Sequence, residues 1–408
     1  MVPGTRRELG KTAAGRKPQT RMAAMSSETP RIWQPLEIYV HLPFCVKKCD
    51  YCDFLSGPYS EDIRSAYVQA VLKEIRSLGR RERAENWKVR SIFFGGGTPS
   101  LMNGEEITQI LDEIRRDFQF EPEAEISLEA NPGTLTENKL KAYQSGGINR
   151  LSLGCQSAKD QELKRLGRIH TWEEFLKSYH MAREAGFQNI NVDLMSGIPG
   201  QSVLDWEENL EAVLALTPEH ISAYSLIVEE GTPFYERELN LPDEDSERRM
   251  YERTREILEE HGYHQYEISN YALRGKECLH NLGYWQRVSY LGVGLGAASL
   301  RKNVRYCNTS DLKEYLAHGA DLDVLQKQRE VLTQREEMEE FLFLGLRMIQ
   351  GIREEEFLKN FGRPLEEAYG NVIEKHEKLG LLERLDGRLR LTRRGISLSN
   401  QVFVDFLS

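Results

Sequence analysis

The sequence has no long apolar run, since none of its stretches approaches the roughly 18 consecutive apolar residues that a membrane-spanning helix requires. It also lacks an excess of positive charge, because 54 Lys and Arg stand against 64 Asp and Glu, which gives a formal net charge of −10. Duplex nucleic acid is bound through a concentrated basic face. These absences argue against a membrane protein and against a nucleic-acid partner, and they favour a small-molecule site.

Cysteine is scarce. The chain has six cysteines in 408 residues, and three of them stand in one short stretch. A secreted disulfide scaffold needs more cysteines, spread more evenly, and no apolar signal segment precedes these. The sequence therefore predicts a reducing, cytoplasmic location.

The first thirty residues carry six basic and two acidic side chains and show no apolar periodicity. We interpret residues 1–30 as a disordered basic N-terminal extension. Arg-rich, acid-poor leaders resemble mitochondrial targeting segments. An upstream start codon, with the true beginning near Met22 or Met25, is the favoured alternative.

From residue 37 onward, short β-rich runs alternate with longer helical patterns. Strands are predicted at residues 37–42, 90–94, 124–129, 150–156, 189–195 and 220–228, and helices at 60–78, 104–118, 136–145, 171–185 and 202–216. Such alternation predicts parallel βα units. Six units fall short of a closed eight-unit barrel, so we expect an α/β fold with a partial (β/α)6 TIM-like barrel over residues 31–230.

The pattern changes twice after this barrel. Residues 231–330 begin with a predicted helix at 246–261, continue into aromatic and glycine-rich stretches, and are predicted to form a central region. From Thr333 onward, helical patterns precede a hairpin at residues 382–391 with an Asp-Gly turn. We therefore predict a smaller C-terminal α+β, winged-helix-like domain over residues 331–408. The acidic chain favours packing or partner contact over nucleic-acid binding for this domain.

Three cysteines, Cys45, Cys49 and Cys52, follow the first predicted strand, at the edge where parallel barrels carry their chemistry. Three thiolates on one tight loop can hold an iron–sulfur cluster, and on a four-iron cube they leave one iron open to an outside ligand. A structural zinc site needs four closed ligands, with His41 or a distant cysteine as the fourth. No second cysteine pair has zinc-ribbon spacing, so the cluster is the favoured interpretation.

The Cys-x3-Cys-x2-Cys spacing resembles the signature of the radical S-adenosylmethionine (SAM) superfamily. It is accompanied by motifs at residues 39–45, 95–100, 129–134, 166–170 and 193–201. Together these resemble the coproporphyrinogen-oxidase-like (HemN-like) branch over residues 37–299. The resemblance implies a [4Fe-4S] cluster on the three cysteines, with SAM at the open iron.

The resemblance also implies which residues bind the cofactors, most of them at or near the ends of predicted strands. They are Tyr39, Phe54, Gly96, Gly97, Thr98, Glu129, Gln156, Arg168 and Asp193. Glycines leave backbone groups accessible to SAM, the acids suit its ribose hydroxyls or amine, and an arginine suits its carboxylate. Taken singly, each of the two acids, the glutamine and the arginine is more typical of a surface or a helix cap, and the glycines are more typical of a tight turn. Core packing is the less favoured alternative for Tyr39 and Phe54.

Two features separate members of this branch. The oxygen-independent coproporphyrinogen III oxidases carry a fourth cysteine two residues after the third, where this chain has Phe54. Residues 278–285 contain a His-Asn-x-x-Tyr-Trp element that resembles the HemW family of heme chaperones. A neutral imidazole is a natural axial ligand of heme iron, so His280 is the candidate heme ligand, with a hydrogen-bonded core histidine as the alternative. The other three cysteines are predicted to be packing thiols.

The resemblance to the heme chaperones implies a cytoplasmic protein that binds heme and passes it to an acceptor hemoprotein, with a respiratory protein at the membrane surface as the expected acceptor. Cluster and SAM would then gate conformation or transfer. Two enzymatic alternatives stay open: oxygen-independent coproporphyrinogen III oxidase, which splits SAM to a 5′-deoxyadenosyl radical, and a radical SAM methyltransferase or heme-degrading relative. A homodimer is compatible with either class.

Overall fold

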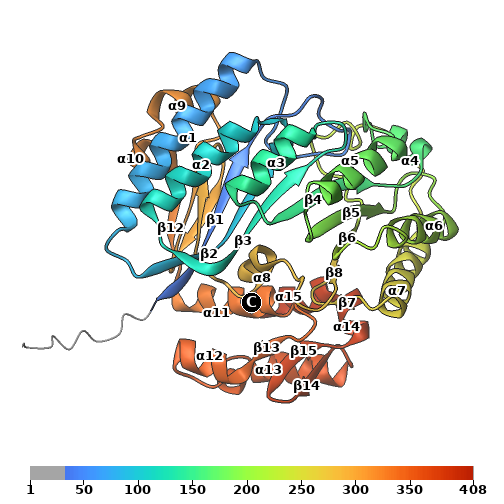
Figure 1. Cartoon of the computed structure of the whole chain (residues 1–408). Helices are drawn as coiled ribbons and strands as arrows, with labels where there is room; N and C mark the ends of the chain where they lie inside the picture. The colour runs from blue at the N-terminus through green and yellow to red at the C-terminus, as the bar shows by residue number, and fades with distance from the viewer. Residues whose placement is uncertain (1–32, 408) are drawn as a thin grey trace, which may run out of the picture. The chain divides into compact units, whose positions relative to one another are not determined.

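The computed structural model describes residues 33–407, so the predicted extension at 1–30 lies outside the described residues. Within the described range the chain forms a twelve-stranded sheet and a separate three-stranded sheet (Figure 1). No helix in residues 33–407 is both long and apolar enough to cross a membrane.

Six parallel strands in chain order form the centre of the large sheet. They are β1 Gln34–Leu42, β2 Trp87–Gly96, β3 Phe120–Ala130, β4 Arg150–Gln156, β5 Ile190–Ser196 and β6 His220–Ser225. The helices between them are α1 Glu61–Glu82, the 3-10 turn Pro99–Leu101, α2 Gly104–Asp117, α3 Glu137–Gly146, α4 Asp160–Arg165, α5 Trp172–Glu184 and α6 Val203–Leu214. Capping boxes begin α5 at Thr171 and α6 at Ser202, as the polar residues before each apolar pattern predict. The predicted α/β fold with a partial, open barrel is confirmed.

The sheet continues beyond both ends of this parallel core. Strand β9, Tyr290–Val293, pairs parallel with β1, and it is followed outward by antiparallel β10 Ala298–Arg301, β11 Val304–Asn308 and β12 Gln326–Val331. At the other end, β8 Asn270–Ala272 and β7 His264–Gln265 pair antiparallel after β6. Residues 231–330 also contain α7 Glu244–Glu260, α8 Leu279–Trp285, α9 Leu312–His318 and α10 Leu322–Leu325. Of the strands that follow residue 230 in this sheet, β9 pairs parallel with β1 and the others pair antiparallel.

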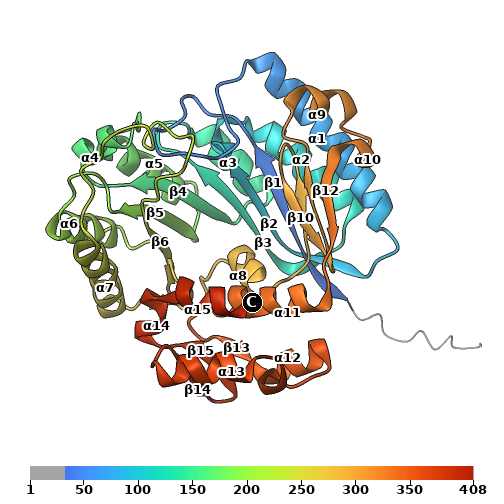
Figure 2. The same ribbon diagram turned by 180° about the vertical axis from the view of Figure 1, so that it is seen from behind.

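The C-terminal part contains the second sheet. Its elements are α11 Gln334–Gly345, β13 Ile352–Arg353, α12 Glu354–Phe361, α13 Leu365–Lys378, β14 Leu382–Leu385, β15 Arg388–Leu391, α14 Arg393–Ser397 and α15 Ser399–Phe406. The predicted hairpin is β14–β15, and its turn residues Asp386 and Gly387 have φ of 51° and 71°. Two central turn residues with positive φ match the twist of an antiparallel pair. Both views place α8 and α11 between the two sheets (Figures 1 and 2).

The two faces of the parallel strands differ in polarity. On β1 one set of alternate residues belongs to the same apolar core as α1 and α2: Ile38, Val40 and Leu42. Successive side chains of a strand point to opposite faces, so the other set faces the inside of the open barrel: Glu37, Tyr39 and His41. Glu37 is in register with Ser91 of β2, which is also polar. The inside of the barrel is therefore lined by polar and aromatic groups, and the candidate site is continuous with this lining.

Candidate functional site

A cavity of about 380 Å³ lies at the carboxyl ends of the parallel strands. Eleven of the predicted site residues line it: Cys45, Cys49, Cys52, Phe54, Gly96, Gly97, Thr98, Glu129, Gln156, Arg168 and Asp193. They come from the loop after β1, from β2 to β5 and from the segment after α4. The structure thus brings together residues that are far apart in the sequence, and it leaves Tyr39 and His280 outside this lining.

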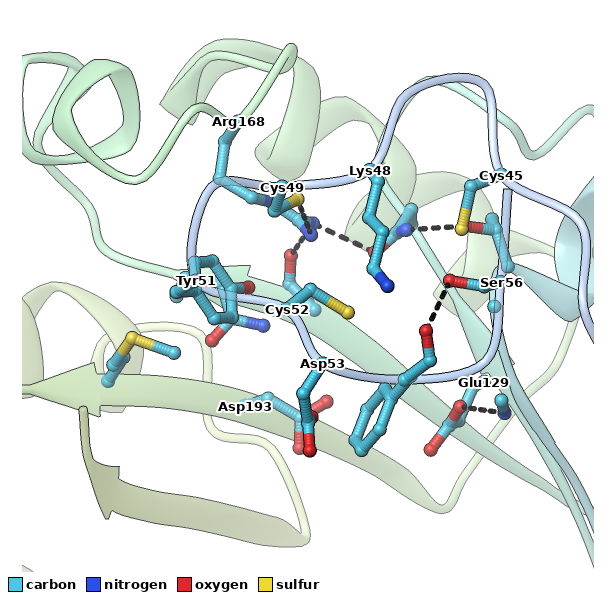
Figure 3. Close-up of a pocket in the computed structure, with 18 of the residues that line it drawn as sticks. Cys45, Lys48, Cys49, Tyr51, Cys52, Asp53, Ser56, Glu129, Arg168 and Asp193 are labelled. Carbon is cyan, nitrogen blue, oxygen red and sulfur yellow. Dashed lines mark hydrogen bonds between the residues drawn. The ribbon is translucent and has the colours of Figure 1, made fainter. Parts of the chain in front are cut away.

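The three cysteines project around the cavity from one loop, residues 43–57, which we call the cluster loop (Figure 3). Backbone bonds from Cys45 N to Gly57 O and from Gly57 N to Pro43 O, both 2.9 Å, close this loop. Burial raises the pKa of the Cys52 thiol. Within residues 33–407 no three His, Cys, Asp or Glu side chains close on a single metal ion. Thiols arranged around a cavity fit a four-iron cube, which is larger than one ion.

Polar side chains donate to two of the thiol sulfurs. The Thr98 hydroxyl lies 3.7 Å from Cys45 Sγ, and Arg168 Nη1 lies 3.6 Å from Cys49 Sγ. Donors of this kind stabilise a thiolate that ligates iron and tune the cluster. The donor set and its surroundings therefore fit an iron–sulfur cluster.

The residues just after β2 pack against the end of β1 and the start of the cluster loop. Gly97 N donates to Leu42 O at 2.9 Å, and Thr98 N donates to Phe44 O at 2.7 Å. A Cβ atom at Gly97 would lie 2.7 Å from Phe44 O, so a larger residue there pushes the loop away. The predicted glycine motif is explained by this close approach.

Two carboxyl groups lie in the cavity. Glu129 accepts a hydrogen bond from Gly96 N at 3.2 Å, and burial together with the charge of Asp193 raises its pKa to about 8. Asp193 accepts bonds from Asn191 at 2.7 Å and from Ser152 at 3.2 Å, and burial raises its pKa as well. Both acids are held in place by donors, and a bound cation or hydroxyl group would favour their ionised forms.

Arg168 and Gln156 complete the wall on the β4 side. Arg168 Nη2 donates to Asn131 Oδ1 at 2.8 Å and to Gly154 O at 2.9 Å. Gln156 has a φ of 67°, and its Oε1 accepts a bond of 2.8 Å from the Tyr224 hydroxyl. A non-glycine residue with positive φ at a strand end is uncommon and is often found at functional sites.

Sequence reasoning missed several residues of this cavity. Tyr51, Asn131, Ser152 and Tyr224 also line it. Asn131 links two predicted site residues, because its Nδ2 donates to Thr98 Oγ1 at 2.8 Å and its Oδ1 accepts from Arg168. Asn131 lies in the motif at 129–134, and Tyr224 lies in the sixth predicted strand. Taking every polar residue at the end of a predicted strand would have found Asn131, whereas Tyr224 lies four residues before the predicted end of its strand.

Tyr39 lies on the inner face of β1, below the cavity. Its hydroxyl lies 3.1 Å from His41 Nδ1, and its ring stacks on Phe93 with centroids 6.4 Å apart. Burial, and next the charge of Glu129, raises the pKa of its phenol. Tyr39 therefore supports the cavity from below without lining it.

His280 lies on α8, nearer the amino ends of β1 and β2, and its side chain is 1% exposed. Its Nδ1 is 2.8 Å from Ser91 Oγ, its Nε2 is 3.1 Å from the Tyr284 hydroxyl, and its ring stacks on Phe93 with centroids 5.2 Å apart. Burial, followed by the charges of Arg150 and Arg90, lowers its pKa to about 3. In this conformation His280 is a neutral residue of the barrel interior with both ring nitrogens engaged.

Helix α8 is held by two buried carboxyl groups. Glu125 accepts bonds from Leu279 N at 3.1 Å and from His280 N at 3.4 Å. Glu37 lies with Oε2 3.9 Å from His280 Nδ1, and neither carboxyl oxygen has a hydrogen-bond partner among residues 33–407. Gly283 packs directly on the Glu37 carboxyl, where a Cβ atom would overlap it.

A chain of hydrogen bonds connects Asp193 in the cavity with α8. Asn191 Nδ2 donates to Asp193, and Asn191 Oδ1 lies 2.6 Å from His220 Nδ1. His220 Nε2 lies 2.8 Å from the Tyr266 hydroxyl, which accepts a bond of 3.3 Å from Cys278 N at the start of α8. The cavity and α8 are therefore two ends of one polar interior.

Comparison with known proteins gives the following matches. Residues 39–213 match the Radical SAM superfamily, and residues 332–398 match the HemN C-terminal domain. The chain is 37% identical to the heme chaperone HemW of Bacillus subtilis (strain 168), over 90% of this chain and 98% of that protein. It is 40% identical to the heme chaperone HemW of Escherichia coli (strain K12), over 64% and 69% of the two chains. It is 32% identical to the mitochondrial radical S-adenosyl methionine domain-containing protein 1 of Danio rerio, over 91% and 86%.

Among solved structures, the coproporphyrinogen III oxidase (HemN) from Escherichia coli is similar with a TM-score of 0.79. The match covers 92% of this chain and 90% of that chain at 23% sequence identity. At this identity the similarity establishes the fold.

Proposed function

The chain belongs to the HemW family of heme chaperones within the radical SAM superfamily, and from this premise we propose that it binds heme and passes it to an acceptor hemoprotein. The observation that carries the proposal is the meeting of three thiols and two carboxyl groups in one cavity, in a chain that aligns with almost the full length of a heme chaperone.

Cys45, Cys49 and Cys52 would hold a [4Fe-4S] cluster, and the cavity beside them would hold an exchangeable SAM. When bound, a cluster on three thiolates supplies one open iron for the amino and carboxylate groups of SAM. The residues of this chain would bind SAM and orient it beside the cluster. Glu129 and Asp193 offer acceptors that are already fixed by Gly96 N, Asn191 and Ser152, and Arg168 offers a cation next to the Cys49 sulfur.

Phe54 favours a chaperone over an oxidase. This residue occupies the position at which the oxygen-independent coproporphyrinogen III oxidases carry a fourth cysteine. Its side chain is 60% exposed and lines the cavity. An exposed apolar ring offers a contact surface and no ligand. The acceptor would be a hemoprotein in the cytoplasm or at the membrane surface.

The proposal is tested on anaerobically reconstituted protein titrated with hemin and followed by its Soret absorbance. We expect saturable binding near one heme per chain. Replacing Cys45, Cys49 and Cys52 with alanine should abolish the cluster, measured as iron per chain, whereas Cys307→Ser is the matched control and should retain it, because Cys307 lies outside the cavity. Heme release to added apomyoglobin, measured with and without SAM, tests gating.

Three results would contradict the proposal. The absence of saturable hemin binding removes its basis. Release of 5′-deoxyadenosine together with decarboxylation of coproporphyrinogen III identifies an oxidase. Formation of S-adenosylhomocysteine, or breakdown of added heme, identifies the methyltransferase or heme-degrading alternative.

A further inference from the structure

Exposed apolar side chains gather around the cluster loop. Of the fifteen large apolar side chains that are exposed within residues 33–407, seven lie on this loop or on segments near it: Val46, Phe54, Leu55, Tyr59, Ile169, Ile227 and Tyr235. The segment around Tyr235 is held to the loop by the 2.6 Å ion pair between Arg237 and Asp50 and by the 3.0 Å bond from Phe234 N to Asp50 O. Concentrations of exposed apolar surface mark binding sites.

Part of this surface belongs to the cofactor cavity itself. Phe54 and Ile227, which are 60% and 68% exposed, line the cavity together with Leu226. We call these three residues the apolar rim. Phe54 belongs to the cluster loop, and the other two residues directly follow β6. A flat apolar ligand in contact with both segments would cover the mouth of the cavity.

The same mouth carries two lysines. Lys47 and Lys48 line the cavity, are exposed, and their ammonium groups form no hydrogen bond or ion pair with any residue in 33–407. Figure 3 shows Lys48 reaching over the cavity from the cluster loop. Asp53 and Glu229 also line the cavity, so its charge is mixed, and an anionic ligand has to turn its acidic groups toward the lysines.

His280 does not offer a comparable place. Its side chain is 1% exposed and lies outside the cavity lining, and its two ring nitrogens contact Ser91 and Tyr284. An axial ligand must present a free nitrogen to the metal. Coordination by His280 therefore requires it to become exposed and to lose its contact with Ser91 or with Tyr284, whereas the rim is open as it stands.

Resting on the proposed function, we propose that a planar tetrapyrrole with two propionates docks on the apolar rim, with its face against Phe54 and Ile227 and its propionates at Lys47 and Lys48. A macrocycle of this class is apolar over its faces and anionic at one edge, which is the pattern of the rim. Because the rim borders the mouth of the cavity, the docked macrocycle also hinders exchange of the cofactor beneath it.

The test compares Ile227→Ser and Lys47→Ser with matched surface controls on the reconstituted protein. Val331 on β12 is 64% exposed and serves as control for Ile227, and the exposed, unpaired Lys313 serves for Lys47. We expect the hemin Kd to rise about tenfold for Ile227→Ser, through lost apolar burial, and severalfold for Lys47→Ser. Val331→Ser and Lys313→Ser should stay within about twofold of the wild type.

Two metal-free probes separate rim docking from iron ligation. Protoporphyrin IX should bind nearly as well as hemin, because the rim contacts do not use the metal. Its dimethyl ester, which lacks the propionate charges, should bind more weakly than the free acid to the wild type, and this difference should shrink in Lys47→Ser.

The outcomes distinguish this inference from the proposed function. If the wild type binds no hemin, both are wrong. If it binds hemin but Ile227→Ser and Lys47→Ser match their controls, the rim assignment is overturned and the chaperone function stands. Loss of hemin binding in His280→Ala, with protoporphyrin IX unable to bind the wild type, overturns the rim and locates the heme at α8.

Discussion

The Nδ1 atom of His280 lies 2.8 Å from Ser91 Oγ and 3.9 Å from Oε2 of the Glu37 carboxyl. All three side chains are buried. Burial lowers the pKa of His280 to about 3 and raises that of Glu37 to about 9, so both groups are neutral at physiological pH. Helix α8 thus carries an uncharged His280 and packs against an uncharged Glu37.

Glu37→Gln should remove a pH dependence of stability. Burial raises the pKa of Glu37 to about 9 from 4.5, the charge of Glu125 adds to this, and Arg90 and Ser91 oppose it. Between pH 4.5 and pH 9 the folded state therefore holds a proton on Glu37 that the unfolded state has lost. The contribution of Glu37 to the free energy of unfolding is complete below pH 4.5 and is lost as the pH rises toward 9. The slope is at most about 1.4 kcal/mol per pH unit.

Urea unfolding from about pH 5 to about pH 8 checks this prediction. The wild type should lose stability relative to Glu37→Gln as the pH rises. Glu105, which is exposed at the start of α2, provides the control, and Glu105→Gln should track the wild type. Parallel curves for the wild type and Glu37→Gln would contradict the raised pKa.

Gly283→Ala should destabilise the fold through a steric clash with the Glu37 side chain, and Glu37→Ala should relieve that clash. A Cβ atom at Gly283 overlaps the Glu37 carboxyl, and overpacking of this kind costs about 1 to 3 kcal/mol. The double variant with Glu37→Ala should be more stable than the sum of the single changes predicts, as measured by thermal or urea unfolding. Strict additivity would show that Gly283 acts through backbone freedom instead.

Glu125→Ala should loosen α8 without unfolding the sheet. The carboxylate accepts bonds from Leu279 N and His280 N, so its removal leaves one partly buried and one buried donor unpaired. Hydrogen exchange of the α8 peptide should become faster by about tenfold or more, whereas the α5 peptide serves as internal control and should not change. Equal acceleration in both peptides would indicate global destabilisation.

Glu129→Gln should weaken SAM binding and spare the cluster. The carboxyl group accepts from Gly96 N inside the cavity and does not contact the thiols through any hydrogen bond found in residues 33–407. Calorimetric titration of the reconstituted protein should give a SAM affinity about tenfold lower at unchanged iron content. The matched variant Glu123→Gln, at an exposed position of the same strand, should bind SAM normally. Loss of iron in Glu129→Gln would assign this residue to the cluster instead.

The regular part of the fold was predictable because its strands are buried apolar runs between capped helices. The bounds predicted for β4, residues 150–156, match the structure, and those of β5 differ by one residue at each end. The strands β7 to β11 were not predicted, because two to five residues are too few for a period to appear and their pairing depends on distant partners. The edge strand β12, with the polar sequence of residues 326–331, carries no alternation to read.

The site was predictable to the extent that it uses strand ends and a short cysteine spacing. Eleven predicted residues share one cavity because parallel strands bring their carboxyl ends together. The surroundings of His280 could not be predicted, since Ser91 and Glu37 reach it only through the packing of α8 under the sheet. A sequence motif can identify a candidate histidine, but whether that histidine is accessible to a ligand depends on the tertiary structure.

The polar interior of the barrel also limits how this sequence can change. Asn191 contacts Ser152, Asp193, His220 and Ser222 through hydrogen bonds, so replacing any one of these residues leaves buried donors or acceptors without partners. An aliphatic core tolerates single conservative exchanges, because shape alone has to be kept. In this polar interior, only simultaneous substitutions at two or more of these positions are expected to be tolerated. In a deep mutational scan these five positions should be intolerant one at a time and permissive only in combinations, so that the interior of the barrel diverges in linked sets of residues.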